Sequence, residues 1–192
     1  MNGPIKYNVI LIGGSAGSLP VLIKMLNALP SVFRIAIIII LHRQKNVASE
    51  MVKILTLHAP SKTIIEPEDK QVVNECCIYL APQNYHLLIE HDNTFSLDYS
   101  EPVQYSRPSI DVTFDSAAKF YKHEALAILL SGANNDGTAG LEAIISQGGT
   151  AIVQDPLTAE YSTMPGEALV KNPKAQSLSP DKIVSFVLSL DC

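Results

Sequence analysis

A short glycine-rich segment contains the first residue whose type and spacing could do chemistry, Ser15. The segment 13–17 reads Gly-Gly-Ser-Ala-Gly and lies between an apolar run and an amphipathic segment. Its Gly-x-Ser-x-Gly spacing is typical of a nucleophile elbow, in which a sharp turn between a strand and a helix exposes a serine hydroxyl. The N–H of Ala16 could then face a developing oxyanion. The alternative is a tight turn of small residues in which Ser15 only caps a helix.

The same glycines do not fit the two common nucleotide-binding patterns. A dinucleotide fingerprint needs glycines at i, i+2 and i+5, and an acidic residue after the second strand. Here the second apolar run is followed by His42. A phosphate loop needs Gly-Lys-Ser or Gly-Lys-Thr, which the sequence lacks. We therefore expect no nucleotide cofactor, and no other cofactor is indicated.

A serine nucleophile needs a base, and the base needs an acceptor that orients it. His42 and Asp136 both come after long apolar runs, as Ser15 does. Because the carboxyl ends of neighbouring parallel strands meet at one crevice, we expect these three side chains to converge there. The alternatives are a strand-end histidine bonded to backbone and an aspartate that caps the helix following it. His86 is the second candidate for the base.

The composition predicts a globular domain with a large core. The chain has 192 residues, of which 47% are hydrophobic and 17% are charged, whereas soluble domains have roughly 25% charged residues. Abundant Ile, Leu and Val indicate strands that are buried on both faces, as in parallel sheets. The net charge of −5 argues against nucleic-acid binding by phosphate neutralisation. It also gives no electrostatic reason for adhesion to anionic lipid.

Strand-like and helix-like segments alternate along the chain, which is typical of an α/β layered domain. Buried strands are expected at 7–12, 35–41, 125–130 and 150–154. Helices are expected at 19–29, 47–58, 138–147 and 165–171, from the N-cap Ser109 to about residue 122, and from Pro180 onward. Shorter β-like runs occupy 62–65, 77–81, 86–90 and 95–99, and the last two predict an antiparallel hairpin near a sheet edge. We expect one domain over residues 1–192.

The apolar runs are too short for a membrane protein. The longest, Ile35 to Leu41, falls far short of the roughly 20 residues that span a bilayer. The N-terminus lacks the apolar region of about 7–15 residues that a secretory signal needs, so we expect a cytoplasmic protein that does not insert into membranes. The three cysteines, Cys76, Cys77 and Cys192, form no CxxC spacing, and no HExxH motif occurs. No metal site is predicted.

Several segments together resemble the catalytic domain of the bacterial chemotaxis protein-glutamate methylesterase family, over nearly the whole chain from Tyr7 to Leu190. The matching segments are the turn at 12–17, Leu41-His42, residues 80–82 with 85–87, Ser106-Arg107-Pro108-Ser109-Ile110-Asp111, residues 130–132 with Asp136, Gly137 and Gly140, residues 154–156, and Met164-Pro165 with Ala168. The resemblance implies a Rossmann-like, doubly wound α/β fold with a mostly parallel sheet.

The resemblance also implies an activity. Family members hydrolyse γ-glutamyl methyl esters on the cytoplasmic helices of chemoreceptors and release methanol, and some also deamidate receptor glutamines. By this likeness Ser15 is the nucleophile, His42 the base and Asp136 its orienter, with the backbone N–H of Ala133 at an oxyanion position. Within this framework we expect Arg107 to anchor the acidic receptor helix, or else to bond nearby loop carbonyls.

Met164 is expected to form part of the wall of the cleft, and simple packing is the alternative.

The sequence also departs from the family pattern. Ala16 stands where a hydroxyl-bearing residue is common, and Arg43 and Gln44 stand where methionine and proline are common. Ala133-Asn134 replaces a frequent methionine-glycine pair.

No phospho-acceptor pattern of a receiver domain precedes Tyr7, so control by phosphorylation within this chain is not expected. Two other functions stay open at this point. One is a serine esterase or amidase that acts on another substrate with the same three side chains. The other is a non-catalytic signalling module of the same fold.

Overall fold

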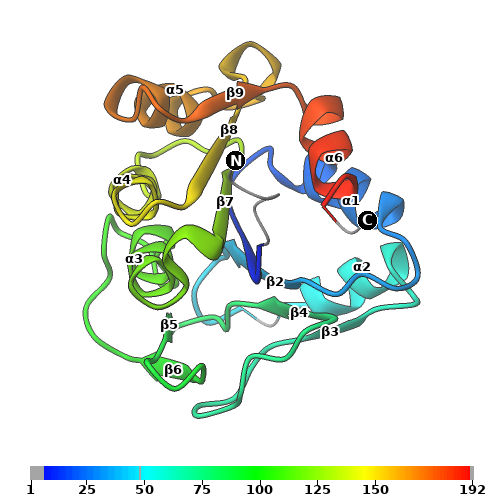
Figure 1. The fold of residues 1–192 in the computed structure, drawn as a ribbon. Helices are drawn as coiled ribbons and strands as arrows, with labels where there is room; N and C mark the ends of the chain where they lie inside the picture. Colours follow the sequence, from blue (N-terminus) through cyan, green and yellow to red (C-terminus); the bar gives the residue numbers. More distant parts are fainter. Residues whose placement is uncertain (1–6, 48, 191–192) are drawn as a thin grey trace.

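Seven parallel strands form the centre of the fold (Figure 1). The computed structural model describes residues 7–47 and 49–190, so Cys192 lies outside the described residues. Every pairing in the main sheet is parallel, and the strand order is β3-β4-β2-β1-β7-β8-β9. The strands are β1 Val9–Gly14, β2 Ala36–Leu41, β3 Thr63–Ile65, β4 Cys77–Leu80, β7 Ala125–Leu129, β8 Thr150–Gln154 and β9 Gln176–Leu178.

Helices cover both faces of this sheet (Figure 1). The central strands β1, β2 and β7 are buried along their whole length because each of their faces packs against a separate core. One core is closed by α1 Leu19–Ala28, α2 Met51–His58 and α6 Pro180–Leu188. The other is closed by α3 Ile110–Tyr121, α4 Thr138–Ser146 and α5 Thr163–Lys171. The expected doubly wound α/β architecture is confirmed.

The first strand begins and ends two residues later than the apolar run suggested. It was expected at 7–12 and is found at Val9–Gly14. The first two glycines of the turn motif therefore belong to the strand, where Gly13 and Gly14 pair with Ile40 and Leu41 of β2. Ser15 is consequently the first residue after the strand. The edge strand β9 was not expected, because its three residues are mostly exposed and carry no apolar pattern.

The expected antiparallel hairpin is present, although it does not extend the main sheet. Strands β5 (His86–Ile89) and β6 (Phe95–Asp98) form a separate two-stranded sheet against α3 (Figure 1). Helix α3 supplies hydroxyl groups to the backbone of β5. The Thr113 hydroxyl donates to the Leu87 carbonyl at 2.7 Å, and the Ser116 oxygen accepts from the Ile89 N–H at 3.0 Å. These side chains replace a neighbouring strand at this edge.

The direction in which the chain winds changes beside β1. Strand β2 follows β1 on one side, whereas β7, which the chain reaches after α3, pairs with β1 on its other side. Such a switch point leaves a crevice at the carboxyl ends of the two strands, where ligands bind in open α/β sheets. The loops after β1, β2 and β7 all open at this edge.

Helices α3 and α4 approach each other closely at Gly140. A methyl group at Gly140 would lie 2.6 Å from the Cβ of Phe114 and 3.1 Å from the Cα of Asp111. The Gly140 N–H also donates to the Asp111 carboxylate at 2.7 Å. Only glycine therefore fits at this contact, which fixes the first turn of α3 beside the loop after β7.

We predict that Gly140→Ala destabilises the protein by about 1–3 kcal/mol, because the added methyl group overpacks the contact between the helices. Gly166→Ala is the matched control, since a methyl group there meets nothing within 4 Å. Alanine at this helical position should stabilise by about 0.5–1 kcal/mol. Urea unfolding of both variants checks the prediction, and equal stabilities would contradict it.

Candidate active site

Ser15 begins a turn that is anchored to the loop after β7. Its N–H donates to the Ser131 carbonyl at 2.9 Å, and its own carbonyl accepts from the Ser18 N–H and hydroxyl. The left-handed residue of the turn is Gly17, at φ 76°, where a side chain would lie 2.6 Å from the Cβ of Glu160. Helix α1 starts only at Leu19. The turn therefore differs from a strained elbow, because its left-handed conformation falls on glycine rather than on the serine.

His42 directly follows the strand that pairs with β1. Leu41 is opposite Gly14 in the register, and the His42 N–H donates to the Gly14 carbonyl at 3.2 Å. Its side chain is 12% exposed, and Nε2 lies 2.8 Å from Oδ2 of Asp136. The ring nitrogen that faces a carboxylate carries the proton, so in the neutral ring Nδ1 has the lone pair. The free base of this imidazole is therefore Nδ1, the nitrogen nearer to the His42 backbone.

The Asp136 carboxylate is fully buried and is held at the N-terminus of α3. Besides His42, it accepts hydrogen bonds from the Ser109 hydroxyl at 2.9 Å, the Ile110 N–H at 2.8 Å and the Asp111 N–H at 3.0 Å. The alternative left open by the sequence was that Asp136 caps the helix after it, but the N-cap of that helix is Gly137. The carboxylate instead binds the unpaired N–H groups of a different helix, where the helix dipole favours negative charge.

These donors decide the protonation of the Asp136 carboxyl group. Burial alone would raise its pKa, but the hydrogen bond from His42 and the N–H groups of Asp111 and Ile110 outweigh burial and lower the pKa below 3.8. The neighbouring carboxyl of Asp111 behaves in the opposite way. Burial and the nearby charge of Asp136 raise its pKa to about 6, despite the hydrogen bond from Gly140. Of the two carboxyls, Asp136 is therefore the one that stays ionised beside the imidazole.

The two predicted oxyanion donors lie on loops that Ser131 joins. The buried Ser131 hydroxyl donates to the Ala16 carbonyl at 2.8 Å, and its N–H donates to the Gln154 side chain at 2.9 Å. Ala16 and Ala133 are exposed, and within residues 7–47 and 49–190 their N–H groups meet no acceptor. Both backbone donors are thus available to a ligand at this edge.

In the structure, Met164 makes packing contacts and His86 makes hydrogen bonds to the backbone. Met164 is fully buried behind the loop, where its side chain packs against Gly132. It matches the packing alternative, because it supports the segment before Ala133 from inside. His86 is also buried, and both of its ring nitrogens bond to backbone, at Glu101 and Ser109. Neither nitrogen of His86 is therefore free to act as the base.

Arg107 bonds to loop carbonyls. Its Nη1 donates to the Tyr99 and Ser100 carbonyls at 2.9 and 2.6 Å, and its guanidinium stacks 3.9 Å from the centre of the Tyr99 ring. Hydrogen bonds from Ser100 lower the pKa of the Asp98 carboxyl, and the charge of the guanidinium also lowers it. The sequence alternative of an arginine bonded to loop carbonyls describes this geometry.

Sequence reasoning assigned no role to Ser106 or to Arg43 beside the imidazole. Ser106 Oγ lies 3.3 Å from Nδ1 of His42. The Arg43 side chain is only 6% exposed, pairs with Glu66 at 2.7 Å and donates to the Ala81 carbonyl. Arg43 therefore fastens the loop after β2 to the end of β4. Ser106 belongs to a segment that the family resemblance had singled out, but its contact depends on a fold that the sequence does not display.

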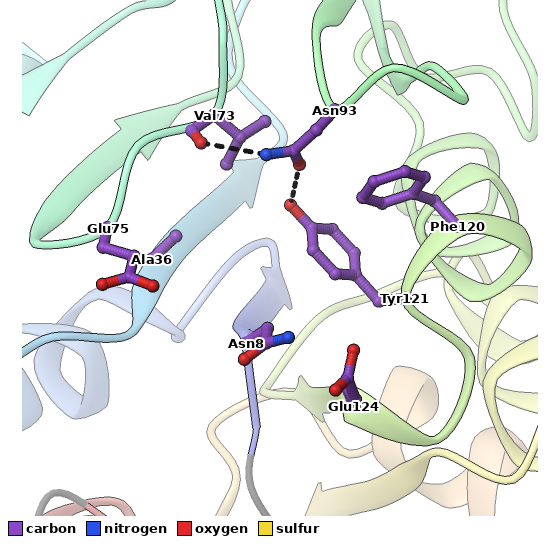
Figure 2. A pocket seen from close by; sticks show the side chains of 8 residues that line it. All are labelled: Asn8, Ala36, Val73, Glu75, Asn93, Phe120, Tyr121 and Glu124. Atoms are coloured by element: carbon purple, nitrogen blue, oxygen red, sulfur yellow. Dashed lines mark hydrogen bonds between the residues drawn. The ribbon is translucent and has the colours of Figure 1, made fainter.

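A pocket of about 410 Å³ lies elsewhere, near the start of β1 and the end of α3 (Figure 2). It is lined by Asn8, Ala36, Val73, Glu75, Asn93, Phe120, Tyr121 and Glu124. It contains none of the candidate catalytic residues.

Over the described residues, no group of three or more His, Cys, Asp or Glu side chains could hold a metal ion. No described helix has both the length and the apolar character needed to cross a bilayer.

Comparisons with known proteins point to one family. The family described as CheB methylesterase matches residues 10–187. A relative from Leptospira interrogans is 42% identical over 187 residues, which cover 97% of this chain and 96% of the relative. A protein-glutamate methylesterase/protein-glutamine glutaminase from Thermotoga maritima is 29% identical over 191 residues, and the match covers 95% of this chain and 55% of that protein. The chain thus spans nearly all of the first relative and about half of the second.

A solved structure has the same fold. The crystal structure of the Thermotoga maritima CheB methylesterase catalytic domain superposes with a TM-score of 0.90 at 28% identity, over 97% of this chain and all of that one. Its fold accounts for the seven-stranded sheet and the flanking helices described above. On the extent of the family match and of the structural likeness, this chain belongs to the CheB methylesterase family, a family of carboxylic ester hydrolases.

Proposed function

We propose that this chain is a serine hydrolase that removes methyl groups from γ-glutamyl methyl esters on the cytoplasmic helices of chemoreceptors. The observation that carries the proposal is the His42–Asp136 pair, 2.8 Å apart, at the strand end next to Ser15. The family membership of the chain supports the substrate class. Deamidation of glutamine side chains would use the same acyl chemistry and is named together with the esterase activity in relatives of this chain.

In the proposed first step, Nδ1 of His42 takes the proton of Ser15 as the serine oxygen attacks the ester carbonyl. The imidazolium that forms is stabilised by the buried Asp136 carboxylate on Nε2. The ionised aspartate also fixes the tautomer, because its oxygen requires a proton on Nε2. Four further donors hold that carboxylate, among them Ser109 and the Gly137 N–H, so the ring has one preferred orientation.

The oxyanion of the tetrahedral intermediate would accept hydrogen bonds from the free N–H groups of Ala16 and Ala133. Such donors stabilise a transition state by about 2.7–4 kcal/mol each when they are fixed in advance. Ser131 fixes them here through its bonds to the Ala16 carbonyl and to Gln154. Methanol leaves with the proton from His42, which then activates a water that releases the glutamate from Ser15.

The proposed substrate also suggests a role for Arg107 and a location for the protein. The positive charge of Arg107, next in the chain to Ser106, would attract an acidic helix. Because the receptor helices lie in the cytoplasm, we infer a cytoplasmic location. We also infer a single catalytic domain over residues 1–192, since the family match already runs from residue 10 to residue 187.

Ser15→Ala is expected to lower methanol release from methylated receptor by about 10³-fold or more, because no oxygen nucleophile remains on the turn. Its free energy of unfolding should stay within about 0.5 kcal/mol of wild type, since the half-buried hydroxyl makes no hydrogen bond inside the described chain. Release of labelled methanol measures the loss. Ser146→Ala on the exposed side of α4 is the control, and full turnover by Ser15→Ala would refute the nucleophile assignment.

A substrate panel separates the proposed activity from the two alternatives. An active-site phosphonate should label Ser15, whereas a non-catalytic signalling module would stay unlabelled. Methylated receptor should be hydrolysed with a higher kcat/KM than small acyl esters. The reverse preference would identify an esterase with another substrate.

Asp136→Asn is expected to lower kcat/KM by about 10³–10⁴-fold, because the amide cannot hold the same imidazole tautomer. It should also destabilise the fold by about 1–3 kcal/mol at pH 7, since an NH₂ group would face buried donors. The pKa of Asp136 is lowered on folding, so its ionised form stabilises the fold above pH 3.8 and this contribution is lost as the pH falls through the folded pKa.

The stability gap between wild type and Asp136→Asn should therefore narrow below about pH 4, which urea unfolding between pH 3 and pH 7 would show. Asp115→Asn is the matched control, because Asp115 is a half-exposed carboxylate of α3 paired with Lys119. A gap that stays constant with pH would show that the charge of Asp136 does not stabilise the fold.

A further inference from the structure

The nitrogen that must accept the proton from Ser15 has a partner in the structure, and that partner is Ser106. Ser106 Oγ lies 3.3 Å from Nδ1 of His42 and 3.4 Å from the Gln104 carbonyl. In the part of the chain that the structure describes, Ser106 provides the hydrogen-bonding contact to Nδ1. Asp136 therefore holds one end of the imidazole and Ser106 the other.

Ser106 closes a tight turn with an uncommon backbone. Val103 and Ser106 exchange two backbone hydrogen bonds, at 3.2 and 2.9 Å. The two residues between them, Gln104 and Tyr105, have φ values of 48° and 62°, in the left-handed region that favours glycine and asparagine. Tyr105 is 94% exposed, so packing of its side chain does not compensate for this conformation. What the turn does achieve is to place the Ser106 hydroxyl on the imidazole.

The segment that follows this turn holds the other half of the pair. Ser109, Ile110 and Asp111 supply three of the hydrogen bonds to the Asp136 carboxylate. One continuous stretch, residues 106–111, therefore contacts Nδ1 of the imidazole and also binds the carboxylate on its Nε2. A single segment entering α3 fixes both partners of His42.

We propose that Ser106 is a positioning residue for His42, whose hydroxyl bonds to Nδ1 before and after that nitrogen takes up the serine proton. The inference rests on the proposed function, in which His42 is the base. In the resting enzyme, the Ser106 hydroxyl donates to the lone pair of the neutral Nδ1. During the reaction the hydroxyl turns to donate to the Gln104 carbonyl, which frees that lone pair to take the proton of Ser15. In the imidazolium, the Ser106 oxygen then accepts from Nδ1–H.

This rotation moves no proton between residues, and it gives the hydroxyl a partner in both states. A bond from a charged N–H to oxygen is stronger than its neutral counterpart, so Ser106 favours the protonated ring. Removing the hydroxyl should therefore cost rate, and should move the acid limb of the pH–rate profile to lower pH. A purely structural role would lower the amount of folded protein without moving that limb.

The first measurement is independent of activity. Nitrogen NMR of the imidazole at pH 7 should show wild-type His42 with a protonated Nε2 and a hydrogen-bonded Nδ1. In Ser106→Ala the Nδ1 resonance should move towards that of a free lone pair, while Nε2 stays protonated. An unchanged Nδ1 resonance would overturn the proposal even if Ser15 proved not to be the nucleophile.

The second measurement is the pH dependence of methanol release. Ser106→Ala should lower kcat by about 3- to 10-fold, the usual effect of one hydrogen bond. KM should stay within about twofold, and the acid limb should shift down by about half a pH unit. Ser106→Thr keeps the hydroxyl and should restore both kcat and the position of the acid limb. Ser100→Ala is the loop control, because its hydroxyl bonds to Asp98, away from the imidazole.

Two results would overturn the role of Ser106. The first is that Ser106→Ala has the same kcat and the same acid limb of the pH–rate profile as wild type. The second is a loss as complete as that of Ser15→Ala, with the phosphonate label of the wild-type protein on Ser106, which would make Ser106 the nucleophile. A label on Ser15 that persists in Ser106→Ala supports Ser15 as the nucleophile, whereas an active Ser15→Ala variant would refute only that assignment.

Discussion

The arrangement at the sheet edge depends on the buried charge of Asp136. A carboxylate without exposure to water is costly unless donors surround it, and here His42, Ser109 and three backbone N–H groups do so. Two of those N–H groups belong to the first turn of α3. The start of that helix must therefore lie beside the loop after β7, and the contact at Gly140 brings it there. The charge, the helix start and the imidazole orientation form one unit, in which the loss of any partner leaves the others unsatisfied.

That unit uses the parallel sheet to bring distant residues together. The ends of β1, β2 and β7 lie side by side at the switch point, so His42 and Asp136 meet although 94 positions separate them, and Ser15 begins the neighbouring turn. The backbone N–H of His42 bonds to the end of β1. Its ring reaches Asp136 through Nε2, and Nδ1 lies 3.3 Å from the Ser106 oxygen.

The sequence predicted from simple features that His42 and Asp136 lie together. Long apolar runs marked the central strands, and the polar residue after each run marked the site, because parallel strands expose their carboxyl ends together. Contacts that depend on how elements pack could not be predicted in this way. Asp136 was expected beside His42, but nothing in the sequence showed that it also binds the start of α3. The contact between Ser106 and His42 spans 64 positions and needs a turn with left-handed Gln104 and Tyr105, neither of which is a typical turn residue.

The edge of the sheet also holds features that stability alone does not explain. The N–H groups of Ala16 and Ala133 meet no acceptor among the described residues, and Gln104 and Tyr105 occupy left-handed backbone positions. A left-handed residue with a side chain costs stability, and such a conformation persists where surrounding contacts fix it. Here those contacts are identifiable, because Ser131 joins the two donor loops and residues 109–111 anchor the turn before them to Asp136. These contacts thus hold the unpaired N–H groups of Ala16 and Ala133 where a ligand can reach them. Such fixed donors are what preorganised catalysis requires.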